Sequence, residues 1–196
     1  MDHASSDERS VNAEKSFVLA SALFPEEEWV LKEPNIWVAK SRLSEEFKEP
    51  NKWEREMSQV RILTDRGSAA YFLPEKQNDD RGKIYADTVI NGEVTELKTV
   101  SGSRTTLGTD FRQGYHQGAA LIKNCIVTEK HSVYIRLLSD LSPGSVKAKI
   151  AGELKGRSGN GTVICYFEVS GLLCYWTYDE LRAIIGMGQK KSPGPA

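Results

Sequence analysis

The pair Asn91-Gly92 constrains the fold of this chain more than any other feature, because it separates two eight-residue runs that favour extended structure. These runs are Lys83 to Ile90 and Glu93 to Val100. Asn-Gly is the preferred pair for a two-residue type I′ turn, in which both residues have positive φ. The sequence therefore predicts a β-hairpin in which Ile90 faces Glu93, and this pairing fixes the register of every further pair.

The hairpin also predicts a cluster of charged side chains. Counting outward from the turn places Asp87 opposite Glu96 and Tyr85 opposite Lys98. Side chains alternate between the two faces of a strand, so Asp87, Glu96 and Lys98 project from one side of the hairpin. Opposed Cβ atoms lie about 5 Å apart, and two carboxylates at that separation repel each other unless a cation joins them. We therefore expect a divalent cation at the pair, with Mg²⁺ as the first choice and Mn²⁺ or Zn²⁺ as others.

Two interpretations of this face remain open. Val89 and Val94 lie on the same side as the acidic pair, so the pair borders an apolar patch, which favours a functional role. An Asp opposite a Glu with a Lys nearby is also typical of an exposed strand edge with ordinary salt bridges. In the functional interpretation, the cation activates a water and neutralises charge on a phosphoryl group, and Lys98 orients that water or stabilises the transition state.

A helix is predicted before the hairpin, with Asn51 as its N-cap and Gly67 as its stop signal. Its apolar stripe has helical spacing and consists of Trp53, Met57, Val60 and Leu63. Glu56 lies on the same stripe, because it precedes Val60 by one turn, and it is a candidate for a third carboxylate ligand. Glu54 is the alternative on the same helix.

The remaining segments alternate between extended and helical patterns, which predicts a mixed α/β (α+β) fold with a central mixed sheet flanked by helices. Further strands are predicted at Ala69 to Leu73, Ser132 to Leu138, Val163 to Val169 and Leu172 to Trp176. Further helices are predicted from about Asp110 with apolar residues up to Ile122, at Ser142 to Leu154, and at Tyr178 to Ile185. The loops between them are Lys76 to Gly82, Ser101 to Thr109 and Gly156 to Gly161.

Three parts of the chain are distinguished by composition. Residues 1–47 form an N-terminal arm and accessory segment, mobile to about residue 15 and followed by a short helix and one or two extended pieces. Residues 48–185 carry the main domain, and residues 186–196, rich in Gly, Lys, Ser and Pro, form a flexible tail. Cys125, Cys165 and Cys174 lack the spacing of a zinc site and are expected to be buried, reduced thiols.

The charge balance limits how the chain can meet a polyanion. Lys plus Arg (26) nearly cancel Asp plus Glu (27), so a nucleic-acid site requires a local basic patch. Its candidates, which are equally well explained as ordinary surface charges, are Lys83, Arg104, Arg112, Lys123 and Lys130. His116 and His131 have no partner at metal-ligand spacing. We expect no membrane segment, no classical signal peptide and a cytoplasmic site of action, either in the producing cell or after delivery from another cell.

The charged residues also resemble a known family. Asp87, followed by Glu96-Leu97-Lys98, is similar to the D-x(n)-(D/E)-x-K core of the PD-(D/E)XK nuclease superfamily. A longer run over roughly residues 48 to 180 resembles the C-terminal toxin domains of contact-dependent growth-inhibition (CdiA-type) proteins and related domains of phage and mobile-element proteins. The residues that carry this likeness are Glu56, Gly67, Phe72-Leu73-Pro74-Glu75, Ala86-Asp87, Gly92, Glu96-Leu97-Lys98-Thr99 and Gln117.

The resemblance implies a restriction-endonuclease-like core, with Asp87, Glu96 and Glu56 as metal ligands, Lys98 as the catalytic lysine and Gln117 as a supporting site residue. Many of the CdiA-type domains are transfer-RNA nucleases, so transfer RNA is the first substrate implied and DNA the second, with an immunity protein as partner if the chain is a toxin. The alternatives are a DNA endonuclease of a phage or mobile element and a non-catalytic nucleic-acid-binding module. The chain departs from the family pattern at Ala86, where the superfamily has proline, and in residues 1–47.

Overall fold

The computed structural model describes residues 6–75, 86–123 and 128–187. Within these residues the chain forms one eight-stranded mixed sheet flanked by six α-helices, which confirms the predicted mixed α/β class. Several sequence predictions lie outside the described residues, namely those for Cys125, Lys83, Tyr85, the loop Lys76 to Gly82 and the tail from residue 188 onward.

The strands stand in the sheet in the same order as in the chain. They are β1 (Trp29–Glu33), β2 (Ile36–Ala39), β3 (Ala70–Phe72), β4 (Thr88–Ile90), β5 (Glu93–Val100), β6 (His131–Leu137), β7 (Thr162–Phe167) and β8 (Leu172–Thr177). The pairs β2–β3, β5–β6 and β6–β7 are parallel, and the other neighbours are antiparallel. Parallel neighbours need a crossover connection, and helices supply it in all three places.

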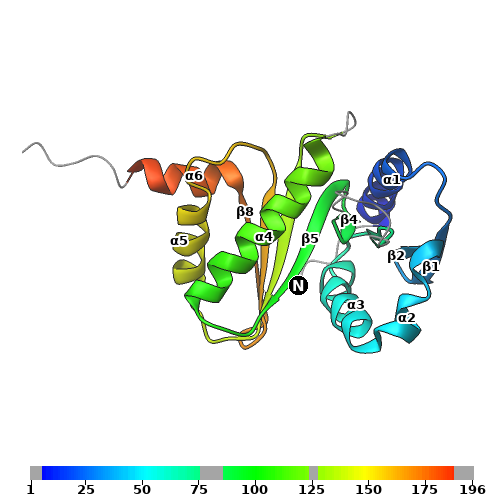
Figure 1. Cartoon of the computed structure of the whole chain (residues 1–196), viewed down its shortest axis with the longest axis horizontal. Helices are drawn as coiled ribbons and strands as arrows, with labels where there is room; N and C mark the ends of the chain where they lie inside the picture. Colours follow the sequence, from blue (N-terminus) through cyan, green and yellow to red (C-terminus); the bar gives the residue numbers. More distant parts are fainter. Residues whose placement is uncertain (1–5, 76–85, 124–127, 188–196) are drawn as a thin grey trace, which may run out of the picture.

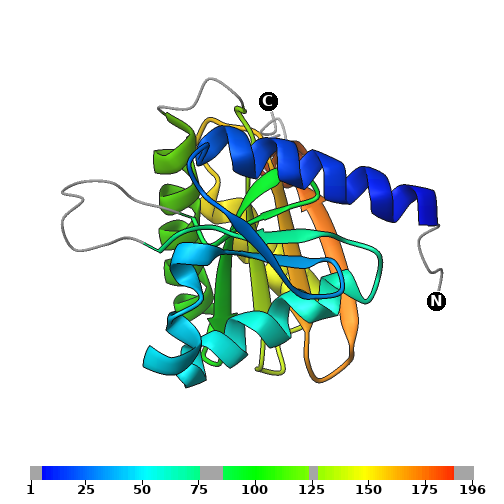
Figure 2. The same ribbon diagram turned by 90° about the vertical axis from the view of Figure 1, so that its right-hand side faces the viewer.

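The helices are α1 (Ser6–Leu23), α2 (Glu45–Lys48), α3 (Pro50–Thr64), α4 (Arg104–Lys123), α5 (Pro143–Glu153) and α6 (Tyr178–Met187), with a short 3-10 turn, η1 (Lys40–Arg42), after β2. Figure 1 shows α4 and α5 on one side of the sheet and α3 on the other. Seen from the side, α1 lies across one end of the sheet, with α3 along the other (Figure 2).

Three apolar clusters join these layers. The predicted α3 stripe is confirmed, because Trp53, Met57, Val60 and Leu63 are buried against one face of the sheet. On the opposite face, side chains of α4, α5 and α6 pack on β6 and β7. Also on that face, Leu19 and Ala20 of α1 pack against Val89 and Val94 of the hairpin. The valines beside the acidic pair are therefore core residues.

The N-terminal segment is more ordered than its composition predicts. We expected an irregular arm to residue 15, but α1 begins at Ser6. Its buried face is narrow and includes the small polar residue Ser16, whose Oγ donates to the Ala69 carbonyl (3.3 Å) and accepts from the Gly92 N–H (3.0 Å). Such a face leaves little apolar periodicity to detect. The following segment, expected as an accessory layer, supplies β1 and β2 to the main sheet.

Two predicted helix starts are also corrected. We expected a loop at Ser101 to Thr109, but α4 begins at Arg104, because the fully buried Leu107 extends the apolar side of the helix by one turn ahead of Phe111. The α3 helix begins at Pro50, whereas we expected Asn51 to be the N-cap. Proline lacks an N–H and has a φ suited to the first helical turn, so it starts the helix.

The hairpin forms as predicted at its turn. Asn91 and Gly92 have φ values of 50° and 80°, and Ile90 pairs with Glu93, Val89 with Val94 and Thr88 with Thr95. The first arm of the hairpin is shorter than expected, because β4 begins only at Thr88. Asp87 lies just before the strand, where its side chain replaces the main chain as the partner of β5.

Candidate active site

Asp87 and Glu96 meet at the point where β4 and β5 cease to pair. The Asp87 Oδ2 atom accepts a hydrogen bond from the Leu97 N–H at 2.8 Å, which fixes the Asp87 carboxylate against β5. Glu96 is one residue away on β5 and is 2% exposed. Asp87 and Glu96 therefore lie close together across the hairpin, as predicted. Asp87 is held there by the hydrogen bond from its side chain to the main chain of β5.

Glu96 is strongly perturbed by this environment. Burial, together with the neighbouring Asp87 carboxylate, raises the pKa of Glu96 to about 8, although Lys98 acts in the opposite direction. The Glu96 Oε1 atom accepts from Lys98 Nζ at 2.7 Å. Its Oε2 atom is buried and has no hydrogen-bond partner among the described residues. A buried carboxylate oxygen without a partner, next to a second carboxylate, fits a divalent cation that takes oxygen ligands.

Lys98 and Gln117 complete one side of this group. Lys98 Nζ donates to Glu96 Oε1 and also to Gln117 Oε1, at 2.8 Å. Gln117 comes from α4, which approaches β5 closely at Gly114. A Cβ atom on Gly114 would lie 3.2 Å from the Glu96 Cγ atom and 3.3 Å from the Lys98 Cε atom. The glycine therefore sets how near Gln117 can come to the charged pair.

Glu56 reaches the same region from α3. It is 8% exposed, and its Oε2 atom lies 2.5 Å from an Arg42 guanidinium nitrogen. Burial raises the pKa of Glu56 to about 7, opposed by Arg42 and reinforced by Asp87. The alternative on this helix, Glu54, instead forms an ion pair with Arg61. In the described part of the chain, Glu56 does not join Asp87 and Glu96 in one group of ligand atoms within 4.8 Å.

A single cleft of about 580 Å³ gathers the residues singled out from the sequence. Its lining includes Glu56, Asp87, Glu96, Lys98 and Gln117. These five come from α3, the start of β4, β5 and α4, so the cleft opens where β4 has ended and β5 continues. The structure thus places the whole predicted set around one space, with Glu96 between Asp87 and Lys98 as the neighbour of both.

Sequence analysis missed Gln59, which supports the cleft from α3. Gln59 is 1% exposed; its Nε2 atom donates to the carbonyls of Lys98 (3.2 Å) and Tyr134 (2.9 Å), and its Oε1 atom accepts from Thr99 Oγ1 (3.2 Å). The available signal was its position one helical turn after Glu56 on the apolar stripe. Arg42 was missed as well, because it lies far from the motif in sequence.

The basic side chains at the cleft differ from the predicted ones. Lys52 and Arg55 line the cleft. Arg55 forms no ion pair within the described residues, whereas Lys52 forms ion pairs with Glu49 and Glu75. The predicted candidates Arg104, Arg112, Lys123 and Lys130 are not part of the cleft lining.

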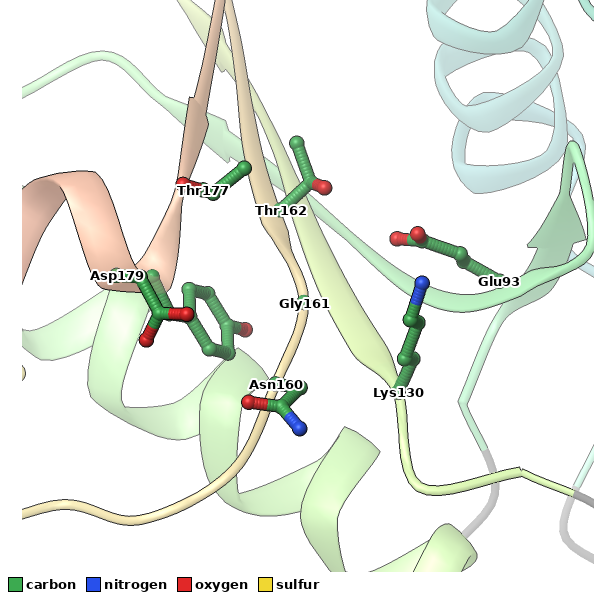
Figure 3. A pocket seen from close by; sticks show the side chains of 8 residues that line it. Glu93, Lys130, Asn160, Gly161, Thr162, Thr177 and Asp179 are labelled. Atoms are coloured by element: carbon green, nitrogen blue, oxygen red, sulfur yellow. The ribbon is translucent and has the colours of Figure 1, made fainter.

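A second, smaller pocket of about 300 Å³ lies near the other end of β5 (Figure 3). Figure 3 shows the Lys130 side chain pointing toward Glu93 on one side of it, with Asn160 and Asp179 on the other. Beside it, His131 is 1% exposed, and burial lowers its pKa to about 4. Neither His131 nor His116 belongs to a group of three or more metal-ligating side chains in the described residues.

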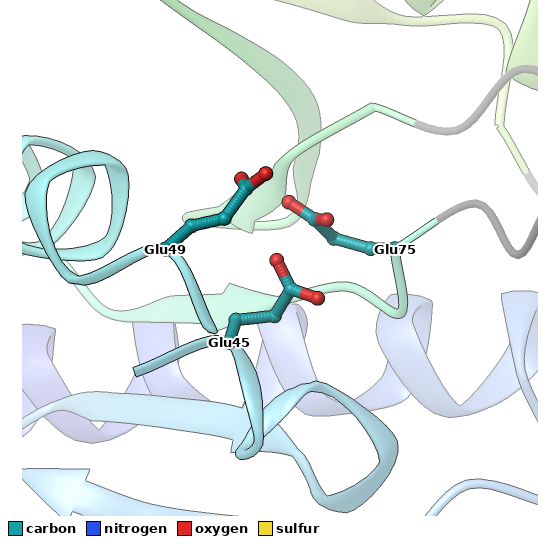
Figure 4. A group of neighbouring side chains, drawn as sticks. All are labelled: Glu45, Glu49 and Glu75. Atoms are coloured by element: carbon teal, nitrogen blue, oxygen red, sulfur yellow. The ribbon is translucent and has the colours of Figure 1, made fainter. Parts of the chain in front are cut away.

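A group of three glutamates stands near the start of α3 (Figure 4). Carboxylate oxygens of Glu45, Glu49 and Glu75 lie within 4.8 Å of one another. Lys52 bonds to Glu75 and lies 3.5 Å from Glu49, and Arg42 lies 3.4 Å from Glu75. These cations already compensate the acidic group, so its closeness alone does not mark a metal site.

A comparison of the chain with protein-family models, with curated proteins and with solved structures finds no match in any of the three. Within residues 6–75, 86–123 and 128–187, no helix combines the length and the apolar character that crossing a membrane requires.

Proposed function

We propose that this chain is a metal-dependent nuclease that hydrolyses phosphodiester bonds in the cleft between α3 and α4. The observation that carries the proposal is the Asp87–Glu96 pair, in which Glu96 is buried, one of its oxygens has no partner among the described residues, and Lys98 contacts the other. Repulsion from the partly buried Asp87 adds to burial in raising the pKa of Glu96, and a cation between the two carboxylates would relieve it, whereas Lys98 bonds to Glu96 alone of the two. A divalent cation would satisfy both.

Asp87 and Glu96 would hold this cation, and Mg²⁺ is the first choice because it takes few carboxylates and keeps several waters. When bound, such a cation polarises a phosphoryl oxygen and lowers the pKa of a coordinated water. Lys98 then stabilises negative charge on the phosphoryl oxygens or orients the attacking water. Gln117 keeps the lysine in place by accepting one of its three N–H bonds, at 2.8 Å.

The substrate side of the proposal rests on charge and on the family resemblance. Arg55 lines the cleft, and its guanidinium forms no ion pair among the described residues, so it is available for a phosphate. The PD-(D/E)XK pattern adds a restriction-endonuclease-like core, and the likeness to CdiA-type domains makes transfer RNA the first substrate and DNA the second. In the toxin version of this proposal, the chain acts in the cytoplasm of a target cell, and an immunity protein covers the cleft.

Incubation with nucleic acid and metal tests the proposal directly. Total transfer RNA and plasmid DNA are each incubated with the protein in Mg²⁺, in Mn²⁺ and in EDTA, and the products are separated on gels. We expect cleavage with metal and none in EDTA. Intact but retarded nucleic acid would instead indicate the non-catalytic binding module. Loss of cleavage in Glu96→Gln, but not in Glu49→Gln, separates this cleft from the acidic group of Figure 4 and from a contaminating nuclease.

A further inference from the structure

Arg42 is an arginine buried beside the cleft, outside the segment that carries the family resemblance. It ends the short turn η1 and is 2% exposed. Arginine is almost never fully buried unless its charge is paired, so its partners indicate what it is for. The guanidinium lies 5.1 Å from the centre of the Phe72 ring in β3, which fixes the plane of the group next to the sheet.

One nitrogen of the guanidinium binds two main-chain carbonyl groups beside the cleft. Arg42 Nη1 donates to the Leu73 carbonyl at 3.1 Å and to the Asp87 carbonyl at 3.0 Å. The Leu73 N–H donates to the same Asp87 carbonyl at 3.0 Å. Leu73 follows β3 and Asp87 precedes β4, so Arg42 joins the end of β3 to the start of β4 and fixes the backbone of Asp87 just before the chain enters β4.

The other nitrogen binds side chains. Arg42 Nη2 donates to Glu56 Oε2 at 2.5 Å and to Glu75 Oε1 at 3.4 Å. One planar group therefore connects the carboxylate of α3 with the strand end that carries Asp87. A lysine offers a single compact ammonium group and cannot reproduce this set of directions.

We propose that Arg42 is the positioning residue of the cleft: its guanidinium sets where the Asp87 carboxylate lies relative to Glu96, and it holds Glu56 beside them. The consequence for catalysis rests on the proposed function, whereas the consequence for geometry does not. The Leu97 N–H reports that geometry, because its hydrogen bond to Asp87 Oδ2 forms only when the Asp87 side chain is in place.

The structure offers a matched control in Arg61. Its guanidinium makes two hydrogen bonds to Glu33 of β1 and one to Glu54, so it also ties α3 to β1, through partly buried and exposed ion pairs. Arg61 does not line the cleft. Arg61 is more exposed than Arg42, and replacing it removes a guanidinium network bonded to α3 without touching Asp87, Glu56 or Leu97.

The experiment compares Arg42→Met, Arg42→Lys and Arg61→Met in the full chain. It measures amide hydrogen exchange at Leu97 by NMR, Mn²⁺ affinity by calorimetry, and global stability by urea unfolding. We expect Arg42→Met to speed exchange at Leu97 at least tenfold beyond the change in global stability and to weaken Mn²⁺ binding at least tenfold. Arg42→Lys should show smaller changes in the same direction, and it replaces the methionine variant if that one does not fold. Arg61→Met should leave both quantities within twofold.

A folded Arg42 variant with the parent's Leu97 exchange and the parent's Mn²⁺ affinity would overturn the positioning role. An Arg61→Met protein that loses as much Mn²⁺ affinity as Arg42→Met would do the same, because the effect would then follow from any ion pair on α3. Failure of the proposed function looks different: the parent itself binds no Mn²⁺ and cleaves nothing, while exchange at Leu97 still decides whether Arg42 positions Asp87.

Discussion

The molecule holds two acidic groups, one with more carboxylates and the other with the more deeply buried one. Glu45, Glu49 and Glu75 bring three carboxylates within 4.8 Å of one another, whereas the cleft brings together only Asp87 and Glu96. Of the three glutamates, Glu49 is exposed, with its side chain 56% accessible, and Glu45 and Glu75 are half-buried, whereas Glu96 is 2% exposed. Counting carboxylates favours the first group as a metal site, and burial favours the second.

The pKa shifts show why burial matters more. In the surface group the pKa of Glu45 is raised and that of Glu75 is lowered, because the two share a hydrogen bond and Lys52 compensates Glu75. In the cleft the pKa values of Glu96 and Glu56 are both raised, chiefly by burial. Solvent and cations have already satisfied the surface group. The cleft retains an electrostatic cost that a bound cation would relieve.

The largest effect expected is on activity when each group loses one charge. Glu96→Gln should lower metal-dependent cleavage by about 10²-fold or more, because the amide keeps the shape of the side chain and removes a ligand charge. Glu49→Gln, the matched change in the surface group, should leave the rate within about twofold. Gel assays under single-turnover conditions measure both, with circular dichroism as the check on folding. Equal losses in the two variants would abolish the distinction between the groups.

The lysine beside each acidic group gives the second test. Lys52 serves the surface group as a partner for Glu75, whereas Lys98 bonds to Glu96 and, under the proposed function, acts on the substrate. Lys98→Met keeps much of the aliphatic stem and removes the ammonium, so we expect a loss of about 10²-fold in rate with Mn²⁺ affinity largely retained. Calorimetry and cleavage assays on the same preparation separate the two. Lost Mn²⁺ affinity at an unchanged rate of the loaded enzyme would give Lys98 only a neutralising role.

The pH dependence of stability sharpens the comparison without any substrate. The pKa of Glu96 is raised in the folded state, so its contribution to stability is full below about pH 4.5 and is lost as the pH rises through about 8. In metal-free buffer, Glu96→Gln should therefore gain stability over the parent between pH 5 and 9, by at least about 1.4 kcal/mol, the equivalent of one pKa unit. Urea unfolding at both pH values measures the gain. Glu45→Gln, at the partly exposed surface group, should show a smaller change, and a larger one would place the unrelieved cost there.

The smallest effect is expected from a change at Gly114, where α4 approaches β5 beside the cleft. Gly114→Ala places a Cβ 3.1 Å from Val133 Cγ1, 3.2 Å from Glu96 Cγ and 3.3 Å from Lys98 Cε, so these neighbours must shift by a few tenths of an ångström. We expect a loss of about tenfold in rate, the equivalent of 1.4 kcal/mol. Gly152→Ala in α5 meets nothing within 4 Å and serves as the control, with an unchanged rate. A fully active Gly114→Ala protein would show that the approach of α4 does not shape the site.

The parts of the molecule that were predicted from sequence rest on local chemistry. The turn needs two residues that accept positive φ, and Asn91-Gly92 supplies both; the register that places Asp87 near Glu96 follows from it. The α3 stripe is equally local, because burial of one helix face leaves a periodic pattern. The predicted site residues lie around one cleft because the hairpin, α3 and α4 carry them.

What could not be predicted depends on contacts between distant segments. Arg42 is one of many charged residues until η1 is packed beside Glu56 and the strand ends, and only then is its burial visible. Gly114 has no turn to explain it, and its reason is the side chains of β5 against which it packs. The start of β4 at Thr88 was not predicted. Asp87 bonds to β5 through its side chain, whereas the sequence pattern implied that its main chain would pair.

The order of the strands has a consequence for how the chain acquires its shape. Each strand's neighbour in the sheet is also the next strand along the chain, from β1 through to β8. Every strand pair therefore joins consecutive segments, and the longest connections that must close are the helical crossovers of the three parallel pairs, so the entropy cost of closure is that of one crossover at a time. A ribosome-bound chain can extend the sheet one strand at a time. The two carboxylates of the cleft meet when β5 is added, but Lys98 acquires its Gln117 partner only after α4 has followed.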